Sequence, residues 1–357
     1  MGSQLMLFLL GLAALIGGAE VLVRGASRIA TAFGLSPLMV GLTVVAFGTS
    51  APELAVATGA ALSGQTAMAL GNVVGSNILN VLMILGAAAL IAPLRVDRQL
   101  IRQEVPIMIG ASLLMLVLAL DGRISRADAA LLTLGLAWYT IFLVRRARLE
   151  RNEPRGDDSS TVARTGVGAR LLDLAMVLAG LALLANGADW LVEAASAFAR
   201  SFGISDLVIG LTVVALGTSA PELAASIVAA LRGERDMAVG NVIGSNLFNI
   251  LGCIGIAGLL APSGLPAPAS LLSFDLWVMI AVAVACLPIF FTGREVARWE
   301  GALFLAYAAA YVGYVLLAAT HHDALPWFSN AMLSFVLPLT VVTLVVSVVA
   351  PGQARGD

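Results

Sequence analysis

Residues 41–55 read GLTVVAFGTSAPELA and residues 210–224 read GLTVVALGTSAPELA, with one difference in fifteen positions. The offset of 169 residues, from Glu53 to Glu222, also aligns GNVVGSN (71–77) with GNVIGSN (240–246). No gap is needed to extend the match back to GAEVLVRGAS (18–27) and GADWLVEAAS (187–196). The chain is therefore an internal duplication in which each half carries the same motifs in the same order.

The composition of the chain is that of a membrane protein. Of its 357 residues, 60% are hydrophobic and 12% are charged, and the mean hydropathy is +0.97. A soluble domain carries about 25% charged residues. The net charge of −2 argues against a nucleic-acid partner, which would need a basic face. Cys253 and Cys286 both lie in apolar runs, so we expect neither a disulfide framework nor a thiol metal site.

Eleven apolar stretches are long enough to cross a bilayer, which takes about 20 residues per helix. They cover residues 4–30, 36–62, 67–91, 103–120, 126–144, 171–199, 205–231, 237–260, 271–291, 300–318 and 330–350. Five stretches fall in each repeat, and an odd number makes the second copy enter the membrane in the opposite sense. We therefore expect an all-α polytopic membrane protein made of two inverted five-helix repeats and an eleventh, C-terminal helix. The expected division is 1–146 for the first repeat, 147–169 for a short cytoplasmic linker, 170–319 for the second repeat, and 320–357 for an outer loop, the extra helix and a cytoplasmic tail.

The arginines predict how the chain is oriented. All 20 basic residues are arginine, and seventeen of them fall in loops on one side of the predicted membrane, against three on the other. Positive charge collects on the cytoplasmic side of membrane proteins. We expect a multi-pass protein of the inner (plasma) membrane, with the N-terminus outside and the C-terminus in the cytoplasm.

Each GTSAPE motif places a proline and then a glutamate in the middle of an apolar stretch. Pro52 and Pro221 lack an N–H and clash with the preceding turn, so each helix must break or kink there. Broken helices of inverted repeats form ion sites near the bilayer midplane. Glu53 and Glu222 follow at once, and a charge at that depth costs at least about 2.5 kcal/mol. We expect a bound cation to offset that cost.

Neutral oxygen-bearing side chains accompany the two glutamates, with no histidine or thiol among them. They are Thr49, Ser50, Ser76 and Asn80 in the first copy and Thr218, Ser219, Ser245 and Asn249 in the second. Such a set suits a hard cation, with Ca²⁺, which takes about six to eight oxygens, as the natural divalent ion and Na⁺ as its competitor. Simple close packing of small residues would not explain Asn72, Asn77 and Asn80 together with their repeat-mates.

The paired GTSAPE and GNVxGSN motifs resemble the two alpha repeats of the calcium/cation antiporter superfamily, and most closely those of short prokaryotic sodium/calcium exchangers. The resemblance covers roughly residues 4–318. It implies a ten-span core in which the first and sixth helices slide against a rigid bundle and expose one site to each side in turn. It also implies that the protein carries no cofactor and is not an enzyme, and that it transports Ca²⁺ and Na⁺ through the lipid bilayer.

The resemblance further implies a role for each site residue. Glu53 and Glu222 are the shared carboxylates, and the six hydroxyls of Thr49, Ser50, Ser76, Thr218, Ser219 and Ser245 are ligands. The carbonyls of Ala46 and Ala215 complete the sodium sites, and Asn80 and Asn249 border the middle site. Many relatives carry Asp where this chain has Asn249, and the potassium-carrying ones have an acid there, so we expect exchange that is independent of potassium. The resemblance also implies three Na⁺ per Ca²⁺, which would make the exchange electrogenic.

Three alternatives stay open or are set aside at this point. Na⁺, H⁺ or K⁺ could each serve as the coupling ion, because two glutamates accept any of them by charge. A passive cation channel could use the same oxygens but needs a continuous pore. A hydrolase would need a nucleophile and base that are absent from the motif. The oligomeric state is not encoded in any of these patterns.

Charged and imidazole groups outside the motifs have simpler explanations. Glu20 and Asp189 occupy equivalent positions in the two repeats, and we expect them to be interfacial charges, with Glu20 paired to Arg24 at helical spacing. His321 and His322 adjoin Asp323 in the last outer loop, where we expect them to be solvated.

Overall fold

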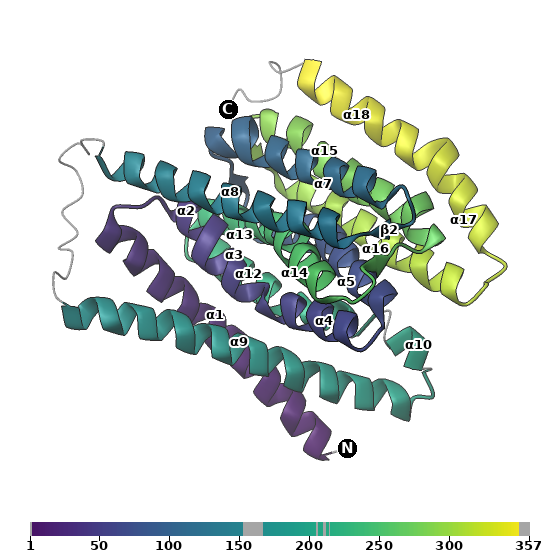
Figure 1. Ribbon diagram of the computed structural model, residues 1–357, viewed down its shortest axis with the longest axis horizontal. Helices are drawn as coiled ribbons and strands as arrows, with labels where there is room; N and C mark the ends of the chain where they lie inside the picture. Colours follow the sequence, from purple (N-terminus) through teal and green to yellow (C-terminus); the bar gives the residue numbers. More distant parts are fainter. Residues whose placement is uncertain (1, 153–166, 205, 210–211, 214, 350–357) are drawn as a thin grey trace.

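A computed structural model describes residues 2–152, 167–204, 206–209, 212–213 and 215–349. The described chain is almost entirely helical (Figure 1). Within it, nine helices are long and apolar enough to cross a membrane, and the bent pair Pro37–Thr49 and Ala51–Leu62 makes a tenth span. The remaining predicted span, at 205–231, contains undescribed positions, and its described residues are mostly helical. The predicted spans therefore agree with the helices to within a few residues at most ends.

The first repeat contains the helices that carry the first copies of the motifs. Its helices are α1 (Gly2–Phe33), α2 (Pro37–Val40), α3 (Ala46–Thr49), α4 (Ala51–Leu62), α5 (Thr66–Leu79), α6 (Gly86–Ile91), α7 (Val105–Ala119) and α8 (Arg126–Asn152). Three π-helical segments join them: η1 (Gly41–Val45), η2 (Asn80–Leu85) and η3 (Leu100–Glu104). π-Helical turns are rare and occur frequently at functional sites.

The second repeat follows the same order. Its helices are α9 (Val167–Ser201), α10 (Asp206–Ile209), α11 (Ala215–Thr218), α12 (Ala220–Leu231), α13 (Arg235–Phe248), α14 (Gly255–Leu260), α15 (Leu276–Phe291) and α16 (Arg298–Ala319). The π-helical segments η5 (Asn249–Ile254) and η6 (Leu271–Asp275) match η2 and η3. The chain then continues through α17 (Leu325–Ala331), η7 (Met332–Val336) and α18 (Leu337–Val349).

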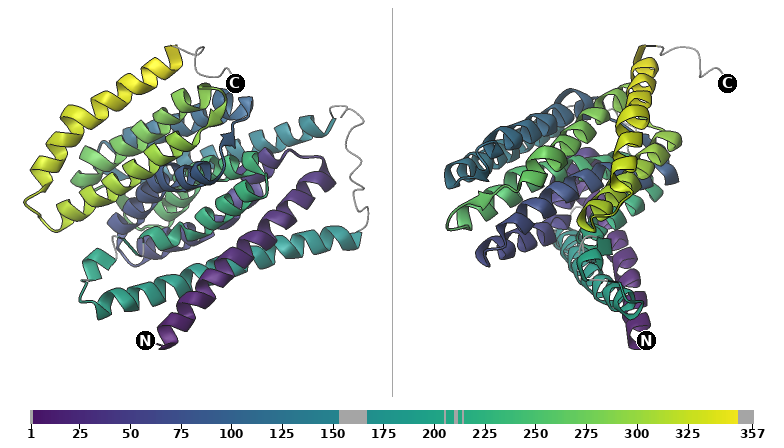
Figure 2. Two further views of the ribbon diagram at one scale, coloured as in Figure 1. Left: turned by 180° about the vertical axis from the view of Figure 1, so that it is seen from behind. Right: turned by 90° about the vertical axis from the view of Figure 1, so that its right-hand side faces the viewer.

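The third and eighth spans form the centre of the bundle. In the most apolar part of each span, 72% of the residues are buried in α5–η2–α6 and 89% in α13–η5–α14, against 0% in the last span. In Figure 2, α1 and α9 form an inclined pair at one side of the bundle, and α17–α18 lie along the opposite side. The two spans that carry GNVxGSN are therefore the ones that the rest of the protein surrounds.

Two short strand pairs join the repeats. Strand β1 (Leu94–Arg95) pairs antiparallel with β4 (Glu295–Val296), and β2 (Arg123–Ile124) pairs with β3 (Leu265–Pro266). Each pair joins a loop of the first repeat to a loop of the second, and paired loops must lie on the same side of the membrane. The chain must therefore cross the membrane an even number of times between the two loops of each pair. The predicted spans give an even number only when the seventh stretch, 205–231, counts as a full crossing.

Glycines allow α1 and α9 to cross in close contact. A Cβ on Gly11 would lie 2.9 Å from the carbonyl oxygen of Gly187, and one on Gly18 would lie 2.9 Å from that of Gly180. Gly11 and Gly180 are equivalent in the two repeats, and so are Gly18 and Gly187. The crossing therefore follows the internal symmetry, and a larger side chain would push the two backbones apart.

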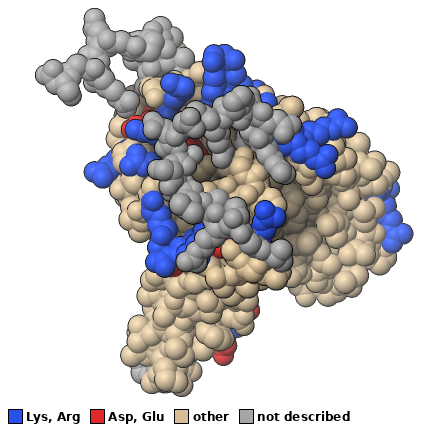
Figure 3. All heavy atoms as spheres, turned by 90° about the vertical axis from the view of Figure 1, so that its left-hand side faces the viewer, with Lys and Arg blue, Asp and Glu red and all other residues tan. Residues whose placement is uncertain are grey.

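Both helices that flank the predicted linker of 147–169 extend into that range. Helix α8 continues to Asn152 and α9 begins at Val167, and the positions between them lie outside the described residues. Figure 3 shows arginine side chains gathered over the face to which these helix ends point. Which side of the membrane this face occupies stays a prediction from the arginine count.

Candidate cation site

The two spans that carry GTSAPE are interrupted at the serine of each motif. The helices on either side of Ser50 are bent by 42°, and Ser50 leaves the helical region at φ −83° and ψ 8°. Ser219 has nearly the same backbone angles, φ −87° and ψ 4°. Each proline then lies in the first turn of the next helix, where no N–H is needed. The predicted break is confirmed in both copies.

The break places both glutamates at helix N-termini inside the protein. Glu53 lies in the first turn of α4 and Glu222 in the first turn of α12, and each is only 1% exposed. Free N–H groups and the helix dipole favour a negative charge at this end of a helix. The fold thus holds two buried acids in the only part of a broken span that favours carboxylates.

Contacts across the repeat bring the first break to the second glutamate. The Ser50 hydroxyl donates to Glu222 Oε1 at 2.9 Å. Asn241 joins the same group, because its Nδ2 donates to the Glu222 carbonyl at 3.4 Å and its Oδ1 accepts from Thr49 Oγ1 at 3.3 Å. Asn241 also donates to Ser226 at 2.9 Å. The break of the first repeat therefore contacts the acid of the second, directly through Ser50 and through Asn241 for Thr49.

The Ala46 carbonyl lies at the same junction. Its oxygen accepts from the backbone N–H of Ser50 at 3.1 Å, from Thr49 Oγ1 at 3.4 Å and from Ser245 Oγ at 3.5 Å. Gly244 allows this approach, since a Cβ there would lie 2.7 Å from the Ala46 side chain. Four of the predicted residues are thus in contact with one another or with a shared neighbour.

A group of four asparagines connects the central spans. Asn80 Nδ2 donates to Asn246 Oδ1 at 3.0 Å, and Asn249 Nδ2 donates to Asn77 Oδ1 at 3.2 Å. These two bonds are equivalent under the repeat, because residues 77 and 80 correspond to 246 and 249. Asn80 and Asn249 each begin a π-helical segment, η2 and η5.

Several buried oxygens of this region have no hydrogen-bond partner. They are Oε2 of Glu53, Oε2 of Glu222, Oγ of Ser219 and Oδ1 of Asn80. A buried polar atom without a hydrogen-bond partner is costly. A hard cation binds oxygen atoms with free lone pairs, and these four atoms provide them. In the described part of the chain, no group of three or more His, Cys, Asp and Glu could hold a metal ion. Hydroxyls, amides and carbonyls must therefore supply most ligands.

The other predicted residues fall as follows. Ser76 is 3% exposed in α5, on the buried central span. Thr218 ends α11, next to Ser219, and Ala215 begins the same helix at the edge of positions that are not described. Among the described residues, no hydrogen bond joins Ser76 or Ala215 to the glutamates. Their part in the site stays a prediction.

Three asparagines outside the predicted set belong to this region. Asn241, Asn77 and Asn246 all make side-chain bonds to predicted residues or to their backbone. The signal was present in the sequence, because each lies in GNVxGSN and has a repeat-mate. Their partners could not be found without the helix packing.

A second buried acid shows what a structural carboxylate looks like in this protein. Glu104 is 0% exposed, and both of its oxygens are bonded: Oε1 accepts from Gln99 Nε2 at 2.9 Å and Oε2 accepts from Tyr139 at 2.7 Å. Glu53 and Glu222 each keep one oxygen unbonded. The contrast separates the candidate site from ordinary buried acids.

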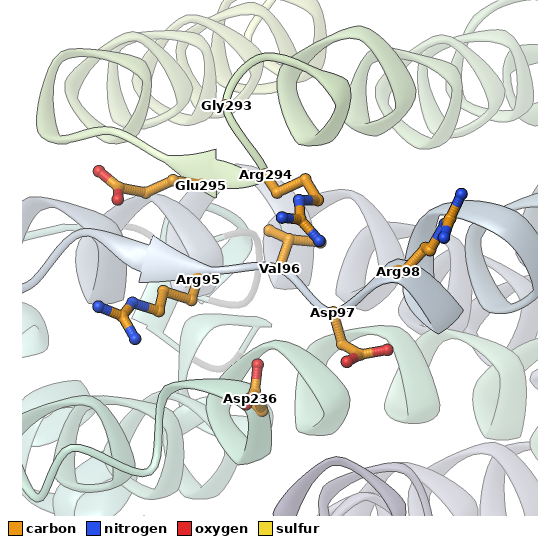
Figure 4. Close-up of a pocket in the computed structure, with 8 residues that line it drawn as sticks. All are labelled: Arg95, Val96, Asp97, Arg98, Asp236, Gly293, Arg294 and Glu295. Atoms are coloured by element: carbon orange, nitrogen blue, oxygen red, sulfur yellow. The ribbon is translucent and has the colours of Figure 1, made fainter. Parts of the chain in front are cut away.

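A hollow of about 400 Å³ lies away from the glutamates, beside the β1–β4 strand pair. Figure 4 shows its lining residues, which include three arginines and three acids: Arg95, Arg98, Arg294, Asp97, Asp236 and Glu295. The opposite charges balance, and the hollow contains none of the predicted ligands. It is not part of the candidate cation site.

The sequence model of the family described as "Sodium/calcium exchanger protein" matches residues 3–145 and 172–318. A relative from Alkalimonas amylolytica, "Putative antiporter CaxA", is 39% identical over 87% of this chain and 96% of its own. "Sodium/calcium exchanger MaX1" of Methanosarcina acetivorans is 35% identical over 86% and 97%. A solved structure of the sodium-calcium exchanger NCX_Mj superposes with a TM-score of 0.74 at 31% identity, covering 87% of this chain and 97% of that one.

Proposed function

Because the chain belongs to the sodium/calcium exchanger family, we propose that it exchanges Ca²⁺ for Na⁺ by alternating access at the site around Glu53 and Glu222. The protein is a multi-pass membrane transporter for cations and not an enzyme, and it uses no cofactor. The observation that carries the proposal is the set of four unpaired buried oxygens, two of them on carboxylates.

The charge of the empty site explains why exchange is favoured over a passive channel. Two carboxylates about 5 Å apart at an effective dielectric near 20 repel each other by roughly 3 kcal/mol. Closing an empty site away from water adds the cost of desolvation. One Ca²⁺ or several Na⁺ offset both costs, so loaded states cross and the empty state does not. That condition couples the two ions.

The proposed ligands are the two carboxylates, the hydroxyls of both broken helices and the carbonyls before the breaks. The support is strongest for Glu53, Glu222, Ser50, Ser219 and Asn80, which are buried and are either unpaired or in contact with a carboxylate. For the first copy, the Ala46 carbonyl is supported by its contact with Ser245.

We further propose that transport is electrogenic and independent of K⁺. Three Na⁺ for one Ca²⁺ would move one net charge, which couples transport to the membrane potential at about 2.3 kcal/mol per 100 mV. Asn249, which is fully buried, contributes a neutral amide where a potassium site would need an acid. The proposed location is the plasma membrane, with the N-terminus outside and the C-terminus in the cytoplasm.

The test is ⁴⁵Ca²⁺ uptake into proteoliposomes that contain the purified protein. Vesicles are loaded with Na⁺, with K⁺ or with acidic buffer, and are diluted into medium without that ion. Uptake driven by internal Na⁺ alone, and increased by an inside-positive potential, supports Na⁺-coupled electrogenic exchange. Uptake driven by the proton gradient, or uptake without any gradient, would contradict it and favour a proton-coupled antiporter or a channel.

A further inference from the structure

The amide of an asparagine has two chemically different ends, and only the oxygen can bind a cation. Asn80 and Asn249 therefore contribute to a cation site only if the protein turns the oxygen, and not the NH₂ group, towards the ion. The two ends have nearly the same shape, so packing alone does not choose between them. The choice has to come from hydrogen-bond partners that accept or donate but cannot do both.

Asn246 has such partners. Its Nδ2 donates to the backbone carbonyl of Asn77 at 3.2 Å and contacts the sulfur of Met108 at 3.6 Å. Neither a carbonyl nor a thioether can donate a hydrogen bond. The NH₂ end of Asn246 must therefore face these two acceptors, which leaves its Oδ1 facing Asn80.

The orientation of Asn80 follows from that of Asn246. The Oδ1 of Asn246 can only accept, and it accepts from Asn80 Nδ2 at 3.0 Å. The opposite end of Asn80 is then its Oδ1, which is buried and has no hydrogen-bond partner. A sequence of three groups, beginning at a backbone carbonyl, thus leaves one amide oxygen unpaired in the region of the two glutamates.

The second copy repeats this logic with different partners. Asn77 Nδ2 contacts the sulfur of Met279 at 3.6 Å, so its Oδ1 faces Asn249, whose Nδ2 donates to it at 3.2 Å. The freed Oδ1 of Asn249 is then contacted by the thiol of Cys253 at 3.5 Å. The repeat-mate of Cys253 is Ile84, which has no donor. The first copy therefore offers the open amide oxygen.

We propose that Asn246 and Asn77 are positioning residues, which turn the amide oxygens of Asn80 and Asn249 towards the transported cation. This inference rests on the proposed function, since it assumes that a cation binds between the glutamates. Asn246 acts on the more open of the two amides. It is the residue whose loss should weaken Ca²⁺ binding most among these two.

The test is a double-mutant cycle with Asn246→Leu and Asn80→Asp. Leucine removes the acceptor and frees the Asn80 amide to turn, so we expect the KM for Ca²⁺ to rise about tenfold with a smaller change in kcat. In the Asn80→Asp background, a carboxylate presents an oxygen in either orientation. There Asn246→Leu should change KM by less than about twofold.

Equilibrium ⁴⁵Ca²⁺ binding to the purified protein gives a second readout, because binding does not depend on the transport cycle. Met108→Leu is the matched control: it removes a sulfur contact of Asn246 but leaves the Asn77 carbonyl, so KM should stay at the wild-type value. If the leucine variant does not fold, as judged by size-exclusion chromatography, Asn246→Ala replaces it in both backgrounds.

Two outcomes would overturn the inference. An unchanged KM in Asn246→Leu would show that Asn80 needs no positioning, and an equal rise in both backgrounds would show that Asn246 acts through packing alone. Absence of Na⁺-driven exchange in the wild-type protein would instead reject the proposed function. The two failures are therefore distinguishable.

Discussion

The two repeats carry equivalent residues at the candidate cation site, but they differ at one edge of the bundle, where α1 meets the turn between α12 and α13. At the centre, Ser50 and Ser219, Glu53 and Glu222, and the two asparagine pairs occupy equivalent places. At the edge, Glu20 of α1 forms ion pairs with Arg24 and Arg232, and Ser27 donates to Glu234 at 2.5 Å. The pairing of Glu20 with Arg24 was predicted, and the one with Arg232 was not.

The equivalent ion pair cannot form between α9 and the first repeat. The repeat-mates of Arg232 and Glu234 are Ser63 and Gln65, which carry no charge, while Asp189 replaces Glu20. The contacts of Glu20 and Ser27 therefore join α1 to the end of α12 and the start of α13 through charged partners that the first repeat lacks.

The largest expected effect comes from removing either half of the symmetric centre. Glu53→Gln and Glu222→Gln should each abolish Ca²⁺ exchange, because each removes a carboxylate from the ion while keeping the size of the side chain. The two losses should be equal, which ⁴⁵Ca²⁺ exchange in proteoliposomes measures. Glu193→Gln, an exposed glutamate of α9, is the control. Substantial exchange by either site variant would mean that the ion binds elsewhere.

Breaking the α1–α9 crossing should have the next largest effect. Gly18→Val would place a Cβ 2.9 Å from the Gly180 carbonyl, whereas a Cβ at the adjacent Gly17 has no atom within 4 Å. We expect Gly18→Val to lower the midpoint of thermal unfolding and to reduce the exchange rate at least severalfold. Gly17→Val should leave both quantities unchanged. Similar behaviour of the two variants would show that the crossing tolerates separation.

A change at Asn249 should sharpen the comparison of the two copies. Asn249→Asp adds a third acid beside the pair while keeping the side-chain shape. Like-charge repulsion then makes protons compete more strongly with Ca²⁺, so exchange should fall more steeply as the pH is lowered. Transport assayed from pH 6 to pH 8, with and without K⁺, measures this change. A wild-type pH profile would place Asn249 away from the bound ions.

The edge contact should have a smaller effect. The side chains of Glu20 and Arg232 are 31% and 33% exposed, and such pairs contribute about 0 to 1 kcal/mol. Arg232→Gln should change the ratio of inward to outward exchange rates by up to about fivefold, and the difference should shrink at high ionic strength. Ser63→Ala, at the equivalent position, should leave the ratio as in the wild type. Equal effects of the two variants would remove the asymmetry.

The smallest effect is expected from the eleventh helix. None of its most apolar stretch is buried, and it contacts the bundle through Tyr307, which meets Thr340 and the Val336 carbonyl. Truncation after residue 320 should leave Na⁺-driven exchange in liposomes, with lower yield. Complete loss of transport from a truncated protein that is folded and monodisperse would make this helix part of the mechanism.

Much of this architecture could be predicted, because long apolar stretches and prolines act locally. The span ends, the breaks at Ser50 and Ser219, and the burial of Glu53 and Glu222 all follow from residues near them in the sequence. The contact of Ser50 with Glu222 and the link from Asn246 to Asn80 could not be predicted, since they depend on how the repeats interleave. The π-helical turns at Asn80 and Asn249 also leave no trace in apolar spacing.

The strand pairs between the repeats can form only after the second repeat has been synthesised. Strand β1, at Leu94 and Arg95, finds its partner only at Glu295 and Val296, near the end of the second repeat. The ribosome makes the first repeat well before the second, so until then β1 and β2 both lack their partner strands and Ser50 lacks Glu222. Glu53 and Glu222 can bind a cation together only after the second repeat has been inserted into the membrane.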